Sequence, residues 1–161
     1  MTPTLRATPP TVTPLDVPDW REVAAIVPPD FKNDGSSDPV LLYALSVLSF
    51  IPWCKRTAQV INEAGRLHDF GFGPGRLTGS GYSHITRAGW NAMYAQHIAD
   101  GGHPRIARRH RWALDRFGQR AWDKWERTMR RWQWHSFEDF KNDRDHKYGY
   151  GRRTENKDMV L

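Results

Sequence analysis

The fold class follows from the stretch PRIARRHRWALDRFGQRAWDKWERTMRRWQW, residues 104–134. At 100° per residue its apolar side chains recur on one side and form a stripe, which predicts an amphipathic helix. The stripe consists of Leu114, Phe117, Ala121, Trp125, Met129 and Trp132. Pro104 suits the first turn of a helix, because a backbone N–H there has no hydrogen-bond acceptor within the helix. Gly118 predicts a break in the helix.

The same stretch carries most of the positive charge of the chain. Residues 103–134 hold ten Lys and Arg against three Asp and Glu, a balance of +7, so the rest of the +6 chain sums to −1. Five of the eight tryptophans lie here, and two of them, Trp112 and Trp134, fall off the stripe, where we expect exposure. Exposed aromatic side chains among arginines are typical of a partner-binding surface. The predicted partner-binding residues are Arg105, Arg108, Arg109, Trp112, Arg130, Arg131 and Trp134.

Two alternatives stay open for this stretch. The stripe can be an ordinary core face, with the arginines as its solvated side. Interleaved Arg and Trp also suit single-stranded nucleic acid, because bases stack on aromatic rings and cations neutralise phosphates. No helix-turn-helix, zinc-ligand set or RNA-recognition signature accompanies them, so a protein partner suits the surface at least as well.

Three more helices are predicted from apolar spacing and from end signals. One starts near residue 40, one covers residues 56–70, and one covers residues 83–99 and is closed by Gly101, Gly102 and Pro104. Residues 71–81 contain five glycines and predict a flexible loop, and residues 20–33 predict a short extended element. The expected fold is mainly α, a compact helical domain over residues 19–135.

Both ends of the chain differ from this domain in composition. Residues 1–18 are rich in Pro and Thr, which predicts either a disordered tail or an extended arm that orders on a neighbouring subunit. Residues 136–161 hold six basic and six acidic residues and predict a peripheral or disordered charged tail.

The composition also excludes several classes of protein. A length of 161 residues suits one domain with tails. The single cysteine, Cys54, excludes a disulfide framework and is expected to be a buried, inert thiol in a reducing compartment. No apolar run approaches the length of a transmembrane helix and no signal peptide is expected, so no membrane partner is predicted.

Two polar motifs stand out from the helical background, FKNDGSSDP at residues 31–39 and RLHDF at residues 66–70. They contain a carboxylate, a hydroxyl and an imidazole, which are the groups that acid–base hydrolysis uses. The candidate catalytic residues are Asp34, Ser37, His68 and Asp69. By composition alone, an ordinary turn and an ordinary helix end are the favoured interpretation of the same residues.

His68 and Asp69 are also candidate ligands for a divalent metal, with His84 as the nearest addition; no other cofactor is expected. His68 lies at helical spacing from Ile61, so its ring is expected to point inward. A buried imidazole needs a partner, and we expect Asp34 to lie within hydrogen-bonding reach of the His68–Asp69 pair.

The order of these motifs resembles that of DUF1353, a family of small uncharacterised proteins found largely in tailed bacteriophages and prophages. The family pattern reads F-x-T-D-G-A-S-I-P, then L-H-D-Y-L-Y, then an R-A helix and a basic helix, and the resemblance covers roughly residues 26–120. The matching residues are Asp34, Gly35, Ser37, Pro39, Leu67, His68 and Asp69, with Phe70 and Phe72 in place of other aromatics.

The chain departs from the family pattern at two positions. Asp38 stands where the family has an apolar residue before the proline, and Gly89 follows Arg87 and Ala88 where the family helix usually carries an acid. The resemblance therefore implies a phage origin more firmly than it implies catalysis.

Three functions follow as hypotheses. The leading one is a virion-associated structural protein, such as a tail, neck or baseplate adaptor. It would be made in the host bacterial cytoplasm and would bind other phage structural proteins or further copies of itself. The second is a small metal-assisted hydrolase that uses the two polar motifs. The third is a host-takeover factor that binds a host protein or nucleic acid through residues 105–134.

Overall fold

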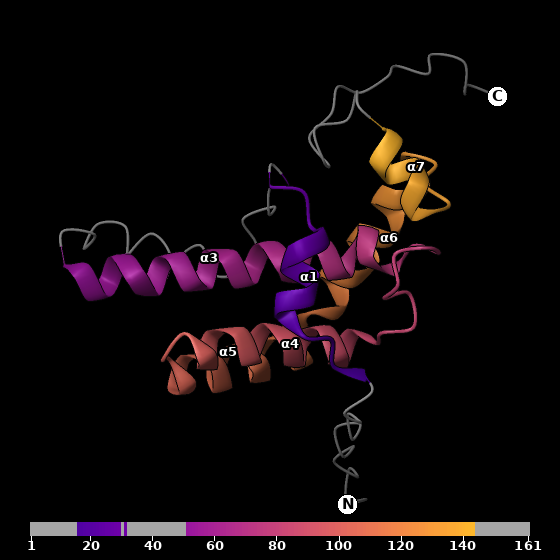
Figure 1. Ribbon diagram of the computed structural model, residues 1–161. Coiled ribbons are helices and arrows are strands. Elements are labelled where there is room, and N and C mark those ends of the chain that lie inside the picture. The colour runs from indigo at the N-terminus through magenta and orange to yellow at the C-terminus, as the bar shows by residue number, and fades with distance from the viewer. Residues whose placement is uncertain (1–15, 30, 32–50, 144–161) are drawn as a thin grey trace, which may run out of the picture.

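The computed structural model describes residues 16–29, 31 and 51–143, and these residues form six α-helices and one 3₁₀ turn (Figure 1). The elements are α1 (Trp20–Ile26), α3 (Pro52–Phe72), η2 (Pro74–Arg76), α4 (Arg87–Asp100), α5 (Pro104–Phe117), α6 (Gln119–Arg131) and α7 (Phe137–Asn142). The described residues contain no β-strand beyond an isolated bridge between Thr78 and Ser136. The predicted mainly α class is confirmed. None of the described helices has the length and apolar character to cross a membrane.

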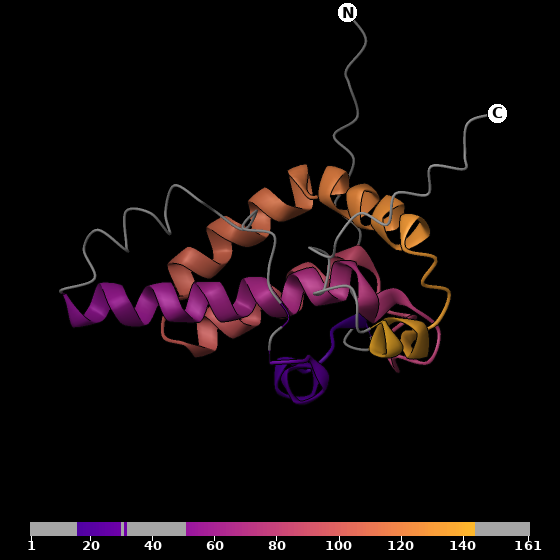
Figure 2. The ribbon, with the colours of Figure 1, turned by 90° about the horizontal axis from the view of Figure 1, so that it is seen from above.

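The long helix α3 runs through the middle of the fold. Helices α4 and α5 form a hairpin whose turn includes Gly102 at a left-handed φ of 92°, and α4 packs on both α3 and α5. Seen from above, α5 and α6 run as an arch along one side of α3, and α1 lies on the other side (Figure 2). The N-terminal helix and the basic helices are therefore on opposite sides of the molecule.

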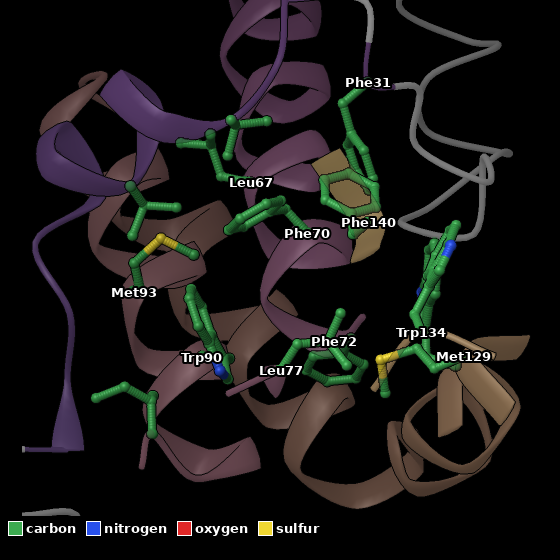
Figure 3. Packing of buried hydrophobic residues seen from close by; sticks show 14 residues of the cluster. Phe31, Leu67, Phe70, Phe72, Leu77, Trp90, Met93, Met129, Trp134 and Phe140 are labelled. Atoms are coloured by element: carbon green, nitrogen blue, oxygen red, sulfur yellow. The ribbon is translucent and has the colours of Figure 1, made fainter. Parts of the chain in front are cut away.

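The larger core cluster is strongly aromatic (Figure 3). Phe70 of α3 meets Phe31 and Phe140 edge to face, with ring centroids 5.8 and 6.4 Å apart. A second cluster lies between α3, α4 and α5, and it consists of Cys54, Ile61, Ala64, Tyr94, Ile98 and Ala107. Cys54 is buried, as predicted.

The glycines after residue 70 pack against tryptophan rings, so the flexible loop expected over residues 71–81 is wrong at its start. Helix α3 continues to Phe72 and is followed directly by η2. A Cβ atom on Gly71 would lie 2.1 Å from the Trp90 ring, and one on Gly73 would lie 2.6 Å from the Trp125 ring. Glycine stands here because only hydrogen leaves room for each indole.

The extended element expected within residues 20–33 is also wrong. The side chain of Asp19 accepts a hydrogen bond from the Arg21 N–H at 2.9 Å and caps α1. Val23 is buried in the larger core cluster, and the partly buried Trp20 packs against that cluster. Packing on the rest of the fold therefore stabilises a helix of only two turns.

The charged tail expected over residues 136–161 is wrong for residues 136–143. Ser136 and Asp139 form a reciprocal capping box that starts α7, and Phe140 is buried. The arm expected over residues 1–18, the helix expected near residue 40 and the rest of the tail lie almost wholly outside the described residues.

The helix break predicted at Gly118 is confirmed, because α5 ends at Phe117 and α6 begins at Gln119. Trp125 and Met129 of the predicted stripe are buried. Phe117 is 63% exposed, in contrast to the prediction. A single helical projection fails across the break because the two helices do not share an axis.

Candidate partner-binding surface and buried polar network

Two aromatic side chains project from the end of α5 into solvent. Trp112 is 64% exposed and Phe117 is 63% exposed, and their rings meet edge to face at 6.0 Å. The guanidinium carbon of Arg116 lies 5.8 Å from the Phe117 ring. We call Trp112, Phe117 and the turn at Gly118 the aromatic corner. The exposure predicted for Trp112 is confirmed.

Exposed arginines surround the aromatic corner. On α5 they are Arg105, Arg108, Arg109 and Arg116, and on α6 they are Arg120, Arg127, Arg130 and Arg131. Within the described part of the chain, none of these four exposed arginines of α5 forms an ion pair with a carboxylate. Arg130 does pair, through a 2.6 Å bond to Oε1 of Glu126. Among the described residues, all four exposed arginines of α5 and three of the four on α6 therefore lack an ion pair.

The one acidic residue of α5, Asp115, is bound by two neighbouring side chains, and its own side chain is 36% exposed. Asp115 accepts from Nε of Arg111 at 2.6 Å and from Nδ2 of Asn91 on α4 at 2.8 Å. From the start of α4, Nη1 of Arg87 donates to the backbone oxygens of Leu114 and Asp115, at 3.1 and 3.4 Å. A cation on the last carbonyls of a helix satisfies groups that have no partner within the helix. Helix α4 thus fixes both the end of α5 and the orientation of its carboxylate.

The exposure predicted for Trp134 is wrong. Trp134 is 5% exposed, its ring packs edge to face on Phe140 at 5.1 Å, and its Nε1–H donates to Asp143 at 2.6 Å. Helix α6 ends at Arg131, and Gln133 takes a left-handed φ of 55°. The chain changes direction there, so a helical projection through residue 134 gives the wrong side.

A hydrogen-bond network runs from the core to Asp115, close in sequence to the aromatic corner. His68 is 3% exposed, which confirms that its ring points inward, and its Nε2 lies 3.0 Å from Oδ1 of the fully buried Asn91. The amide of Asn91 donates to the Asp115 carboxylate, so Oδ1 faces His68 and Nε2 carries the hydrogen. The network links the core to the surface through His68, Asn91, Asp115 and Arg111.

The structure brings together only part of the predicted hydrolase site. Asp34 and Ser37 lie outside the described residues, so their distance from His68 stays a prediction. Asp69 is buried, with Oδ1 3.9 Å from Nδ1 of His68, and His84 is exposed. In the described ranges, no three His, Cys, Asp or Glu side chains group as metal ligands.

A second polar contact, which sequence reasoning missed, holds α1 on α4. The Trp20 and His97 rings stack at 4.1 Å and 15°, and Nε1 of Trp20 donates to Asp100 at 2.9 Å. Nη2 of Arg21 also donates to Asp100, at 3.2 Å. Burial lowers the pKa of His97, while the nearby carboxylates of Glu63 and Asp100 oppose that shift and Arg21 adds to it.

Comparison of the chain with family models, curated proteins and solved structures found no match. The resemblance to DUF1353 stays a prediction from the motifs.

Proposed function

We propose that this protein is an assembly component that binds other proteins through the aromatic corner and the arginines around it. In the setting that the motif resemblance implies, it is a structural protein associated with a phage virion. The observation that carries the proposal is the exposure of Trp112 and Phe117 beside arginines that form no ion pair with any carboxylate of the described residues. Trp and Arg are the residues most enriched among those that dominate protein–protein binding energy.

The state of His68 supports a binding function over hydrolysis. A general base must come within hydrogen-bonding distance of the proton that it removes. His68 is buried, its Nε2–H donates to Asn91, and its other ring nitrogen, Nδ1, lies 3.9 Å from the buried Asp69 carboxylate. Such an imidazole is typical of a residue that stabilises the fold.

Site-specific photo-crosslinking tests the proposal. A photoreactive phenylalanine analogue replaces Trp112, and the protein is produced in the bacterium during phage growth. The matched control carries the analogue at Ala25, an exposed residue of α1, on the opposite side of the fold (Figure 2). Purified particles are then analysed by mass spectrometry.

We expect the chain in purified particles and a cross-link from position 112 to another structural protein, with no such product from position 25. Absence of the chain from particles would refute the proposal. Cross-links to nucleic acid in place of protein would favour the host-takeover hypothesis.

A further inference from the structure

The exposed charge of α5 is mostly positive. Arg105, Arg108, Arg109 and Arg116 recur at three- to four-residue spacing around Trp112, over about 16 Å of helix. The only carboxylate of α5, that of Asp115, is bound by Arg111 and by Asn91 of α4, and its side chain is 36% exposed. A partner that covers this face must therefore supply negative charge, because burying unpaired guanidinium groups is costly.

The shape of the face distinguishes between two kinds of negatively charged partner, a single-stranded nucleic acid and an acidic protein. The junction of α5 and α6 is the apex of an arch, on the side away from α1 (Figure 2). Trp112 and Phe117 project from this apex as a contacting pair. Proteins that bind single-stranded nucleic acid hold the backbone in a basic groove. A projecting aromatic pair instead complements an apolar pocket in another protein.

The aromatic corner is held rigidly before any partner binds. Arg87 bonds the last carbonyls of α5, and Arg111 fixes Asp115. The turn itself is tight, because a Cβ atom on Gly118 would lie 2.5 Å from the Leu114 oxygen. A pre-formed surface loses less conformational entropy on binding, which favours a specific partner.

Charge also disfavours the other occupants that the chain could supply. A second copy that met this surface with the same face would present the same +7 stretch and be repelled. Among the segments outside the described residues, residues 1–15 sum to +1 and residues 144–161 to +2, so they have the same sign as the surface. Asp30 and residues 32–50 together sum to −2, which is too little to neutralise four arginines. Building on the proposed function, we infer that Trp112 and Phe117 enter an apolar pocket of a different protein, and that carboxylates on the pocket rim pair with the α5 arginines.

Fluorescence anisotropy with the full chain tests this inference. The main probe is a labelled acidic peptide with apolar residues at helical spacing. A second peptide has the same charge with serine at every apolar position, and a third probe is an oligothymidine of matched charge. Trp112→Ala removes the projecting indole, and Trp53→Ala is the matched control because Trp53 is 58% exposed on α3, outside the basic stretch. Circular dichroism checks that each variant is folded.

We expect the apolar acidic peptide to bind at least about tenfold more tightly than the serine peptide. Trp112→Ala should remove that difference, and Trp53→Ala should leave it unchanged. Arg108→Gln with Arg109→Gln should weaken binding of both peptides. Equal binding of the two peptides, no effect of Trp112→Ala, or tighter Trp112-dependent binding of oligothymidine would each overturn the inference.

The particle experiment above separates the two claims. If the chain is absent from particles but Trp112 still discriminates between the peptides, the virion assignment fails and the pocket chemistry stands. If the chain is in particles and binds the two peptides equally, the inference of an apolar pocket with an acidic rim is wrong and the virion assignment stands.

Discussion

Replacing Gly71 with alanine tests the packing between α3 and α4. A Cβ atom at this position would lie 2.1 Å from Cε3 and 2.2 Å from Cδ2 of Trp90. Carbon atoms in contact lie about 3.5–4.0 Å apart, so the indole or the helix must shift by about 1.5 Å. Trp90 is fully buried, and a close-packed interior leaves little room for that shift.

The expected cost follows from two opposing effects. Overpacking a core lowers the free energy of unfolding by about 1–3 kcal/mol, and a displaced tryptophan belongs at the upper end of that range. Alanine stabilises a helix by about 1 kcal/mol relative to glycine, which offsets part of the cost. The net loss is about 2 kcal/mol, or about 4–8 °C in Tm for a domain of this size.

Thermal and urea unfolding, followed by circular dichroism, measure this loss. The decisive comparison repeats Gly71→Ala in a Trp90→Leu background, where the smaller side chain leaves space for the new methyl group. There the cost should fall below about 0.5 kcal/mol or become a gain, because the two sites are coupled through contact. An equal cost in both backgrounds would refute the reasoning.

Three further predictions concern buried polar and aromatic groups. Asn91→Ala leaves the Nε2–H of His68 without its acceptor and should lower the free energy of unfolding by about 1–3 kcal/mol in urea titrations. Because burial lowers the pKa of His97, the unfolded chain binds this proton more readily; stability should be highest above a pH of about 6.5 and should fall as the pH drops below it. Trp134→Ala removes a buried ring and should cost about 3–5 kcal/mol, against less than about 0.5 kcal/mol for the exposed Trp112→Ala.

Each of these predictions has a matched control. Gln59→Ala, at an exposed position of α3, should leave stability unchanged where Asn91→Ala does not. His97→Phe keeps a ring to stack on Trp20 but cannot titrate, so a pH dependence that survives in this variant belongs to another group. Equal costs for the two tryptophan variants would contradict the burial difference between Trp134 and Trp112.

Periodicity predicted the parts of the fold that depend on local sequence. The apolar spacing of α3, α4 and α6 and the break at Gly118 were readable because a helix repeats every 3.6 residues. The exposure of Trp112 followed from the same projection. The inward ring of His68 did too, since its position relative to Ile61 is set within one helix.

Contacts between distant segments decided the rest. The glycines at 71 and 73 have a loop-forming composition, and only Trp90 and Trp125, on other helices, explain why the chain stays ordered there. Helix α1 is too short to show a pattern, and Trp20 finds its partner on α4. Asn91 is one polar residue on a buried helix face, and the sequence signal for it is its place between Trp90 and the apolar Met93 and Tyr94.

The bond between Trp20 and Asp100 has a consequence for the order of folding. It joins residues 80 positions apart, whereas the α4–α5 hairpin closes through a short turn. Closing a long loop costs more chain entropy and delays the contact that closes it. The hairpin and α3 should therefore assemble first, and α1 should dock last. For the same reason, local unfolding of the native protein should begin at α1. The backbone amides of Val23 and Ala24 should then exchange with solvent sooner than those of α4.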